Sequence, residues 1–216
     1  MPVAPITEIV AEMKAGRMVI LVDEEDRENE GDLVLAADCV SADAVNFMAR
    51  FGRGLVCMSI TEARARQLAL APMTPVNRSV HGTNFTVSIE AAHGVSSGIS
   101  AADRAHTIRV AAAANATPDD IVRPGHVFPL RARPGGVLER RGHTETAVDL
   151  AVLAGLPPVA VTCEVLADDG SPARLADLRD FASSHRIAMV SVEQVVQYRL
   201  ANASATQRST VATLLL

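Results

Sequence analysis

The stretch VILVDEEDRENEGDLVLA, residues 19–36, places a strongly acidic segment between two apolar runs. Each run is four residues long and wholly apolar, which is typical of a strand inside a sheet. Between the runs, residues 23–32 carry a formal charge of −6, whereas the whole chain of 216 residues carries −5. The acidity of the chain is therefore concentrated in one segment, between two strands that have to be buried.

Apolar runs alternate with amphipathic stretches along the rest of the sequence, and Ser41 and Ser100 stand where helix N-caps are expected. The expected helices lie near residues 6–13, 41–50, 61–70, 100–114, 144–155, 173–185 and 191–202. The expected strands cover residues 18–22, 33–37, 54–60, 84–91, 126–132, 159–166 and 187–192. Strands follow one another early and alternate with helices later. We therefore expect an α/β (α+β) fold, a single layered domain in which helices cover a mixed β-sheet.

The composition is that of one folded domain. Hydrophobic residues make up 49% of the chain and charged residues 21%, which does not match the composition of a disordered segment. No linker rich in Pro, Gly or Ser divides the sequence. We expect one domain over residues 1–205. Residues 206–216 lack a strong pattern and are expected to form a flexible tail.

Several classes of function are disfavoured. Aromatic residues are only 3% of the chain and the net charge is negative, so we expect no nucleic-acid partner. No apolar run approaches the roughly 20 residues of a membrane span, and the first residues do not resemble a signal peptide. The three cysteines have no CxxC spacing, which suggests reduced thiols. These features predict a cytoplasmic protein without a membrane partner.

The acidic segment has two interpretations. Most such segments are solvated turns. This one, however, contains several Glu residues in place of the usual turn formers, and it keeps Arg27 inside the run. Closely spaced carboxylates raise one another's pKa and destabilise the fold unless a cation is bound between them. Oxygen ligands suit Mg²⁺ or Mn²⁺. The segment alone therefore indicates a metal site.

A second unusual segment covers residues 123–150. It holds His126 and His143, and the pair Arg140 and Arg141 precedes a helix expected to start near Thr144. Basic side chains and free N–H groups at a helix N-terminus form an anion site, for which phosphate is the natural ligand. The alternative is that each His is an ordinary surface or core residue.

Taken together, these segments resemble the 3,4-dihydroxy-2-butanone 4-phosphate synthase family. The similarity runs in family order from about residue 6 to residue 200. DRENEGD and RGHTETAVDLA are highly specific as a pair. The matching stretches are VDEEDRENEGDLVLAA, FMARFGRGLVCMSIT, HGTNFTVSIEA, GISAADRAHTI, RPGHVFPLRARPGGVLERRGHTETAVDLAVLAGL and VTCEVLADDG.

The resemblance implies a lyase of riboflavin biosynthesis. It would convert D-ribulose 5-phosphate to L-3,4-dihydroxy-2-butanone 4-phosphate and formate through a metal-stabilised enediolate, without an organic cofactor. Residues 1–205 would form the synthase domain, and the protein would be a homodimer with its site near the interface. Many members carry a GTP cyclohydrolase II domain after this one. Because the sequence ends at residue 216, we expect a monofunctional form.

The resemblance also assigns roles to residues. Glu28 and His143 would bind two Mg²⁺ or Mn²⁺ ions. The implied catalytic residues are His126, Glu164, Asp32 and Cys57. The implied substrate-binding residues are Arg27, Glu28, Asp32, Arg140, Arg141, Gly142, His143, Thr144 and Glu164. Whether Glu164 or Asp32 is the principal proton carrier stays open, and Cys57 is equally well interpreted as a small core residue.

Two alternatives remain. A metal-dependent sugar-phosphate isomerase or aldolase would form the same enediolate and release no formate. A non-catalytic sugar-phosphate-binding module would be expected to have lost charged site residues, whereas Glu28, Asp32, His126, His143 and Glu164 are all present.

Overall fold

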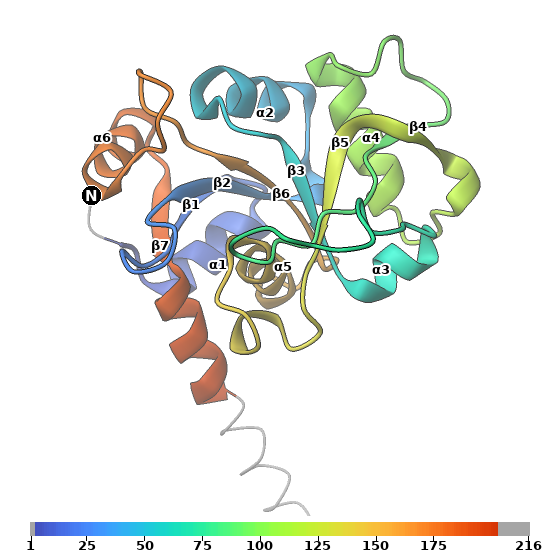
Figure 1. Ribbon diagram of the computed structural model, residues 1–216. Coiled ribbons are helices and arrows are strands. Elements are labelled where there is room, and N and C mark those ends of the chain that lie inside the picture. The colour runs from blue at the N-terminus through green and yellow to red at the C-terminus, as the bar shows by residue number, and fades with distance from the viewer. Residues whose placement is uncertain (1–2, 203–216) are drawn as a thin grey trace, which may run out of the picture.

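The structure, a computed structural model, describes residues 3–202. A single mixed sheet of seven strands runs through the middle of the molecule (Figure 1), in the order β4-β5-β3-β6-β2-β1-β7. The strands are β1 (Val19–Val22), β2 (Gly31–Ala36), β3 (Cys57–Ile60), β4 (Ile89–Ala91), β5 (Ile121–Arg131), β6 (Val159–Glu164) and β7 (Ala188–Ser191). Parallel and antiparallel pairs both occur, so the predicted mixed sheet is confirmed.

Helices cover both faces of this sheet, which confirms the predicted layered fold. One hydrophobic cluster joins one face to helices that include α2, α4 and α6, and a second cluster joins the other face to α1, α5 and the helix at 192–202. The helices are α1 (Ile6–Lys14), α2 (Ala42–Phe47), α3 (Glu62–Gln67), α4 (Ala101–Ala112), α5 (His143–Leu153) and α6 (Leu175–His185).

Residues 19–36 form the antiparallel pair β1–β2 inside the sheet, with β7 beside β1 and β6 beside β2. Every residue of both strands is buried, because alternate side chains enter opposite clusters. Leu33 lies in the first cluster and Val34 in the second. Asp32, two residues before Val34, therefore points to the α5 face of the sheet.

Several predicted elements differ from the observed ones, and the strand expected at 126–132 begins earlier, at Ile121. The strand expected at 84–91 shortens to β4, because the amides of Thr86 and Val87 bond to the carbonyls of Pro129 and Ala71 outside any regular ladder. The helix expected at 41–50 changes at residue 48 into a wider π-helical turn.

Two further expectations concern membrane spans and the extent of the domain. No helix within residues 3–202 is long and apolar enough to cross a membrane. The single domain over residues 1–205 stays a prediction, and the tail predicted at 206–216 lies outside the described residues.

The central strand pair generates a stability prediction. Leu33 is 0% exposed in the first cluster, so Leu33→Ala should lower the free energy of unfolding by about 2–5 kcal/mol through lost burial and a cavity. Val122→Ala is the control, because Val122 is 48% exposed and the change should stay within about 0.5 kcal/mol. Urea unfolding measures both. Equal effects of the two substitutions would contradict the placement of Leu33.

Candidate active site

The acidic loop between β1 and β2 is organised by its first residue, Asp23. The Asp23 carboxylate accepts hydrogen bonds from the backbone N–H groups of Glu28 at 3.2 Å and Glu30 at 2.9 Å. Arg27 donates to the same carboxylate at 2.6 Å and to the Glu28 carboxylate at 2.9 Å. Arg174, the N-cap residue of α6, donates to the carbonyl of Glu28 at 2.9 Å. Two arginines, Arg27 within the loop and the exposed Arg174 beside it, therefore hold the loop.

This arrangement explains how so much acidity fits between two buried strands. Glu24, Glu25 and Asp26 are exposed, so for them the interpretation as a solvated turn is correct. Asp23, Glu28 and Asp32 turn inward, where they meet Arg27 or the ring of His143. The repulsion expected from the sequence is thus partly removed by solvent and partly by pairing.

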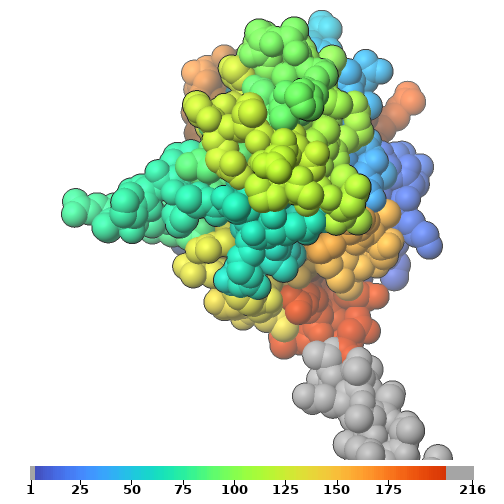
Figure 2. Space-filling view, turned by 90° about the vertical axis from the view of Figure 1, so that its right-hand side faces the viewer, coloured from blue at the N-terminus to red at the C-terminus, as the bar shows by residue number. Residues whose placement is uncertain are grey.

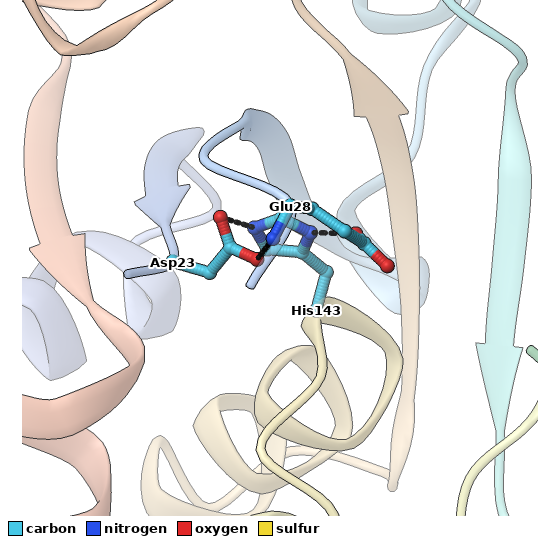
Figure 3. A group of neighbouring side chains, drawn as sticks. All are labelled: Asp23, Glu28 and His143. Atoms are coloured by element: carbon cyan, nitrogen blue, oxygen red, sulfur yellow. Dashed lines mark hydrogen bonds and ion pairs between the residues drawn. The ribbon is translucent and has the colours of Figure 1, made fainter. Parts of the chain in front are cut away.

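His143 lies between carboxylates at the start of α5. Gly142 precedes His143 as the N-cap of the helix. The His143 side chain is 8% exposed. Figure 3 shows the ring between Asp23 and Glu28. The Nδ1 atom is 3.6 Å from Glu28 Oε2 and 3.7 Å from Asp32 Oδ1, and the Nε2 atom is 4.0 Å from Asp23 Oδ1. One imidazole therefore faces three carboxylates from a single loop and its following strand.

The proximity shifts the pKa values of this group. Burial raises the pKa of Asp32 to about 7, and the charges of Glu164 and Glu28 add to the effect against the opposing charge of His143. Burial alone would lower the pKa of His143, but Asp32 and Glu28 outweigh it and raise the pKa to about 9. The pKa of Glu28 falls to about 2 because His143 and Arg27 face its carboxylate. Without a metal ion, a proton on His143 supplies the positive charge that these carboxylates require.

The cluster fits a divalent cation. Asp23, Glu28 and His143 each offer one ligand atom, and these atoms lie within 4.8 Å of one another. Two buried atoms of the group, Asp32 Oδ1 and His143 Nε2, have no hydrogen-bond partner among the described residues. A hard cation takes carboxylate oxygens and tolerates an imidazole nitrogen. Sequence reasoning named Glu28 and His143 but missed Asp23, whose only signal is its place directly after a strand.

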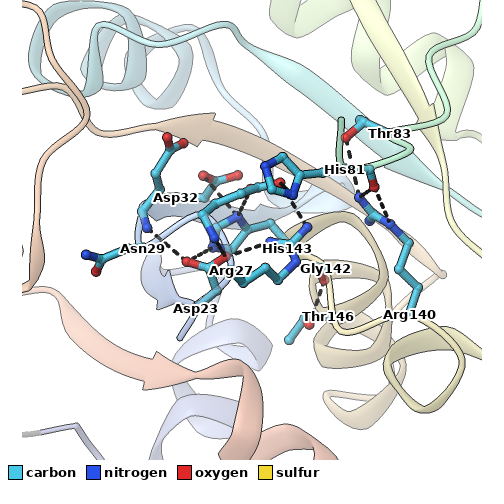
Figure 4. Close-up of polar contacts among 12 residues, drawn as sticks. Asp23, Arg27, Asn29, Asp32, His81, Thr83, Arg140, Gly142, His143 and Thr146 are labelled. Carbon is cyan, nitrogen blue, oxygen red and sulfur yellow. Dashed lines mark hydrogen bonds and ion pairs between the residues drawn. The ribbon is translucent and has the colours of Figure 1, made fainter. Parts of the chain in front are cut away.

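A cavity of about 70 Å³ opens beside this cluster. Several predicted substrate-binding residues meet there, and Figure 4 shows many of them around it. The lining residues are Arg27, Glu28, Glu30, Asp32, Thr83, Leu130, Arg140, His143, Thr144 and Glu164. Sequence reasoning had not named Glu30, Thr83 or Leu130 as site residues, although Glu30 belongs to the acidic segment and all three lie in the matching stretches.

The basic side of the cavity is held rigidly. Arg140 pairs with the buried carboxylate of Glu145 at 2.6 Å and donates to the carbonyl of His81 at 2.9 Å. Thr144 lies in the first turn of α5, where backbone N–H groups lack helical partners. The guanidinium and the helix N-terminus lie where the sequence predicted an anion site, and the binding of an anion there stays a prediction.

The carboxylates of Asp32 and Glu164 come from neighbouring positions on two strands. The residues are paired in the register of β2 and β6, so their side chains lie on one face of the sheet. Glu164 Oε2 accepts a hydrogen bond from the Leu55 N–H at 2.8 Å. This approach requires glycine at position 54, where a Cβ would lie 2.5 Å from the Glu164 carbonyl oxygen. Two acid–base groups therefore meet at one edge of the cavity.

Four predicted residues do not line this cavity: Cys57, Arg141, His126 and Gly142, the N-cap of α5. Cys57 is 2% exposed, and burial, followed by the charges of Glu164 and Asp32, raises its pKa well above the usual range, so it is a neutral thiol. Arg141 points away and pairs with Glu193 at 2.7 Å. His126 lies on β5, with its ring against Glu90. Their roles stay predictions.

The shifted pKa values generate a pH prediction for the metal-free protein. Between about pH 6.5 and 9 the folded state holds a proton on His143 that the unfolded state has released, so the free energy of unfolding should fall as pH rises. The raised pKa of Asp32 acts in the same direction below about pH 7. Urea unfolding in EDTA tests this, with the double variant Asp32→Asn/His143→Gln as control. A slope that persists in the double variant would show that other groups cause it.

Comparisons with known proteins give the family. The model of the 3,4-dihydroxy-2-butanone 4-phosphate synthase family matches residues 7–198. The riboflavin biosynthesis protein RibBA of Aquifex aeolicus is 55% identical over 197 residues, which cover 90% of this chain and 48% of that protein. The 3,4-dihydroxy-2-butanone 4-phosphate synthase of Shewanella pealeana is 50% identical over 198 residues, covering 92% of this chain and 93% of the relative.

The fold agrees with these matches. A crystal structure of a 3,4-dihydroxy-2-butanone 4-phosphate synthase in complex with two magnesium ions is 39% identical, with a TM-score of 0.85, covering 90% of this chain and 96% of that one. The chain spans about half the length of several curated relatives, among them those from A. aeolicus and Neisseria meningitidis. The acidic loop and the start of α5 both fall within the matched residues. The chain belongs to the 3,4-dihydroxy-2-butanone 4-phosphate synthase family.

Proposed function

We propose that the protein is a metal-dependent lyase that converts D-ribulose 5-phosphate to L-3,4-dihydroxy-2-butanone 4-phosphate and formate in riboflavin biosynthesis. One observation carries the proposal: the buried group of His143, Glu28 and Asp23 opens onto a cavity whose other side is basic. A sugar phosphate has the matching chemistry, because its hydroxyl and carbonyl oxygens suit a metal ion and its phosphate suits Arg140 and the start of α5.

The metal ligands we propose are Glu28 and His143, with Asp23 as a third candidate. Few protein ligands suit Mg²⁺, which keeps water molecules and takes further oxygens from the substrate. We propose two Mg²⁺ or Mn²⁺ ions per site, in line with the related structure described with two magnesium ions. Bound there, the ions supply a Lewis acid for negative charge that develops on the sugar oxygens.

The proton transfers fall to Asp32 and Glu164. Removing the C–H proton beside the ketone gives an enediolate, and the later steps return protons before formate leaves. A carboxylate is effective in such steps when its pKa lies near the working pH, and burial raises the pKa of Asp32 to about 7 in the metal-free protein. Glu164 is held by the Leu55 N–H, so Asp32 is the better candidate for the first transfer. His126 remains a further proposed acid–base residue, and Cys57 a neutral side chain beside the site.

Substrate orientation follows from the basic residues. Arg140, fixed by Glu145, and Thr144 would hold the phosphate, while Arg27 at the loop approaches the sugar. Gly142 is the N-cap of α5, so its backbone lies directly before the first helical turn, which contains Thr144. Arg141 would have to leave Glu193 to contact substrate, and we assign it the outer rim of the site.

We propose that the protein works as a homodimer with a shared site. His126 does not line the cavity of its own chain, and its side chain is 44% exposed, which suits a contribution to the site of a second subunit. Figure 2 shows the segment around residues 72–83 projecting from the body. It carries Val76 and Val80, which are 63% and 94% exposed. Exposed apolar side chains of this kind are typical of an interface.

The compartment and the domain are also proposals. Cys39, Cys57 and Cys163 are free thiols, which supports a reducing compartment, and we propose the cytoplasm. The single continuous sheet supports one synthase domain over residues 1–205.

Metal dependence and product identity can be tested together. Formate release from ribulose 5-phosphate should stop in EDTA and return with Mg²⁺, and Glu28→Gln should lower kcat by about 10²–10³-fold even at high Mg²⁺. Glu25→Gln is the matched control, because Glu25 is an exposed carboxylate of the same loop and its loss should leave kcat unchanged. Consumption of substrate without formate would favour an isomerase or aldolase, and full turnover in EDTA would exclude the metal.

Mixing two inactive variants tests the shared site. Glu28→Gln and His126→Ala, dissociated and reassembled together, should regain about a quarter of wild-type formate release, because half of the dimers are mixed and each has one intact site. Each variant reassembled alone is the control. Dimers that form without regaining activity would mean that each chain completes its own site.

A further inference from the structure

The segment that carries His126 is lifted out of the sheet. In the register of β4 and β5, Ile89 pairs with Val127 but Glu90 pairs with Val122, so residues 123–126 form a bulge. Gly125 allows this, because a Cβ there would collide with the carbonyl group of Ile89, and its N–H donates to the Ser88 hydroxyl at 3.1 Å. Bulges commonly re-aim a side chain beside an active site. Here the bulge turns His126 back toward Glu90.

Glu90 holds His126 with one oxygen and is itself held through the other. Its Oε2 atom lies 2.6 Å from His126 Nδ1 and accepts the His126 backbone N–H at 3.2 Å. The Oε1 atom accepts the hydroxyl of Thr107, from α4, at 3.0 Å, and that hydroxyl accepts the Ala91 N–H at 3.0 Å. Because Glu90 is 7% exposed, this carboxylate has one fixed orientation.

A third segment closes over the pair. Gly98 has φ +87°, and a Cβ there would collide with the Glu90 carboxylate and lie 2.6 Å from His126 Nδ1. Asp103, in the first turn of α4, holds this segment by accepting the Gly98 N–H at 3.1 Å and the Ser96 hydroxyl at 2.7 Å. The Glu90 side chain is therefore only 9% exposed, and a hydrogen bond to a shielded carboxylate is stronger than one in water.

We propose that Glu90 is the positioning residue of His126. The carboxylate accepts the proton of Nδ1 and thereby leaves Nε2, at the other end of a ring that is 44% exposed, as the nitrogen that takes and returns a proton. A carboxylate that orients an imidazole and fixes its tautomer is a recurrent device in enzymes. The proposal rests on the proposed function, which gives His126 its catalytic role, and Glu90 itself does not touch the substrate.

Glu90→Gln tests the kinetic consequence. The amide keeps the shape of the side chain but removes the charge, so kcat for formate release should fall about 10- to 100-fold while KM changes less than about twofold. Asp149→Asn is the matched control. It makes the same change at a carboxylate that pairs with Arg199 at 2.7 Å and does not line the cavity, so it should lower the melting temperature and leave kcat unchanged. Wild-type kcat in Glu90→Gln would overturn the proposal.

Nitrogen-15 NMR of the histidine rings separates this proposal from the proposed function, because it needs no turnover. The His126 signals are assigned by their absence from His126→Gln. In the neutral wild-type ring the proton should reside on Nδ1, and in Glu90→Gln that preference should be lost. A wild-type ring protonated on Nε2 would overturn the positioning role. The expected tautomer in a protein that releases no formate would leave the positioning role intact and contradict the proposed function.

Discussion

The burial of one imidazole among carboxylates is the constraint on which the rest of the site depends. His143 is 8% exposed and meets Asp23, Glu28 and Asp32 at 3.6–4.0 Å. Such a group is stable only if a positive charge lies among the carboxylates, and without metal that charge is the His143 proton. A divalent cation bound as we propose would replace the proton and free the imidazole as a ligand. The same group would then account for both the proposed metal site and the pH behaviour of the protein without metal.

The sheet supplies the rigidity that this arrangement needs. β1 and β2 are buried on both faces, so the loop between them has fixed ends, and Asp32 is held in register with Glu164. The other side of the group comes from α5, whose first residue is His143. The apolar side chains of α5 belong to the second hydrophobic cluster, which packs against the same sheet. Because a helix and a strand pair meet at a packed face, the distances between ligand atoms are set by the core.

The fold and the centre of the site were readable from the sequence for physical reasons. Buried strands appear as apolar runs, and the loop and the start of α5 concentrate opposite charges. The family resemblance assigned Glu28, His143 and Arg140 to one site, and the structure places them around one cavity. Contacts made by backbone geometry were not readable. The role of Asp23 depends on amide groups of its own loop, and the Glu90–His126 pair depends on a bulge. The irregular segment 84–88 failed as a strand because its hydrogen bonds are divided between β5 and the loop residue Ala71 and form only isolated bridges. Sequence periodicity carries no signal for any of these.

We propose that a divalent cation takes the place of a proton on His143. Calorimetric titration of Mg²⁺ at pH 7.5, repeated in buffers of different ionisation enthalpy, counts the protons released on binding. Because the pKa of His143 is raised to about 9 in the metal-free protein, about one proton per site should be released. His143→Gln should bind Mg²⁺ more weakly and release fewer protons. Tight binding by the wild-type protein without proton release, or unchanged release in the variant, would show that no such exchange occurs.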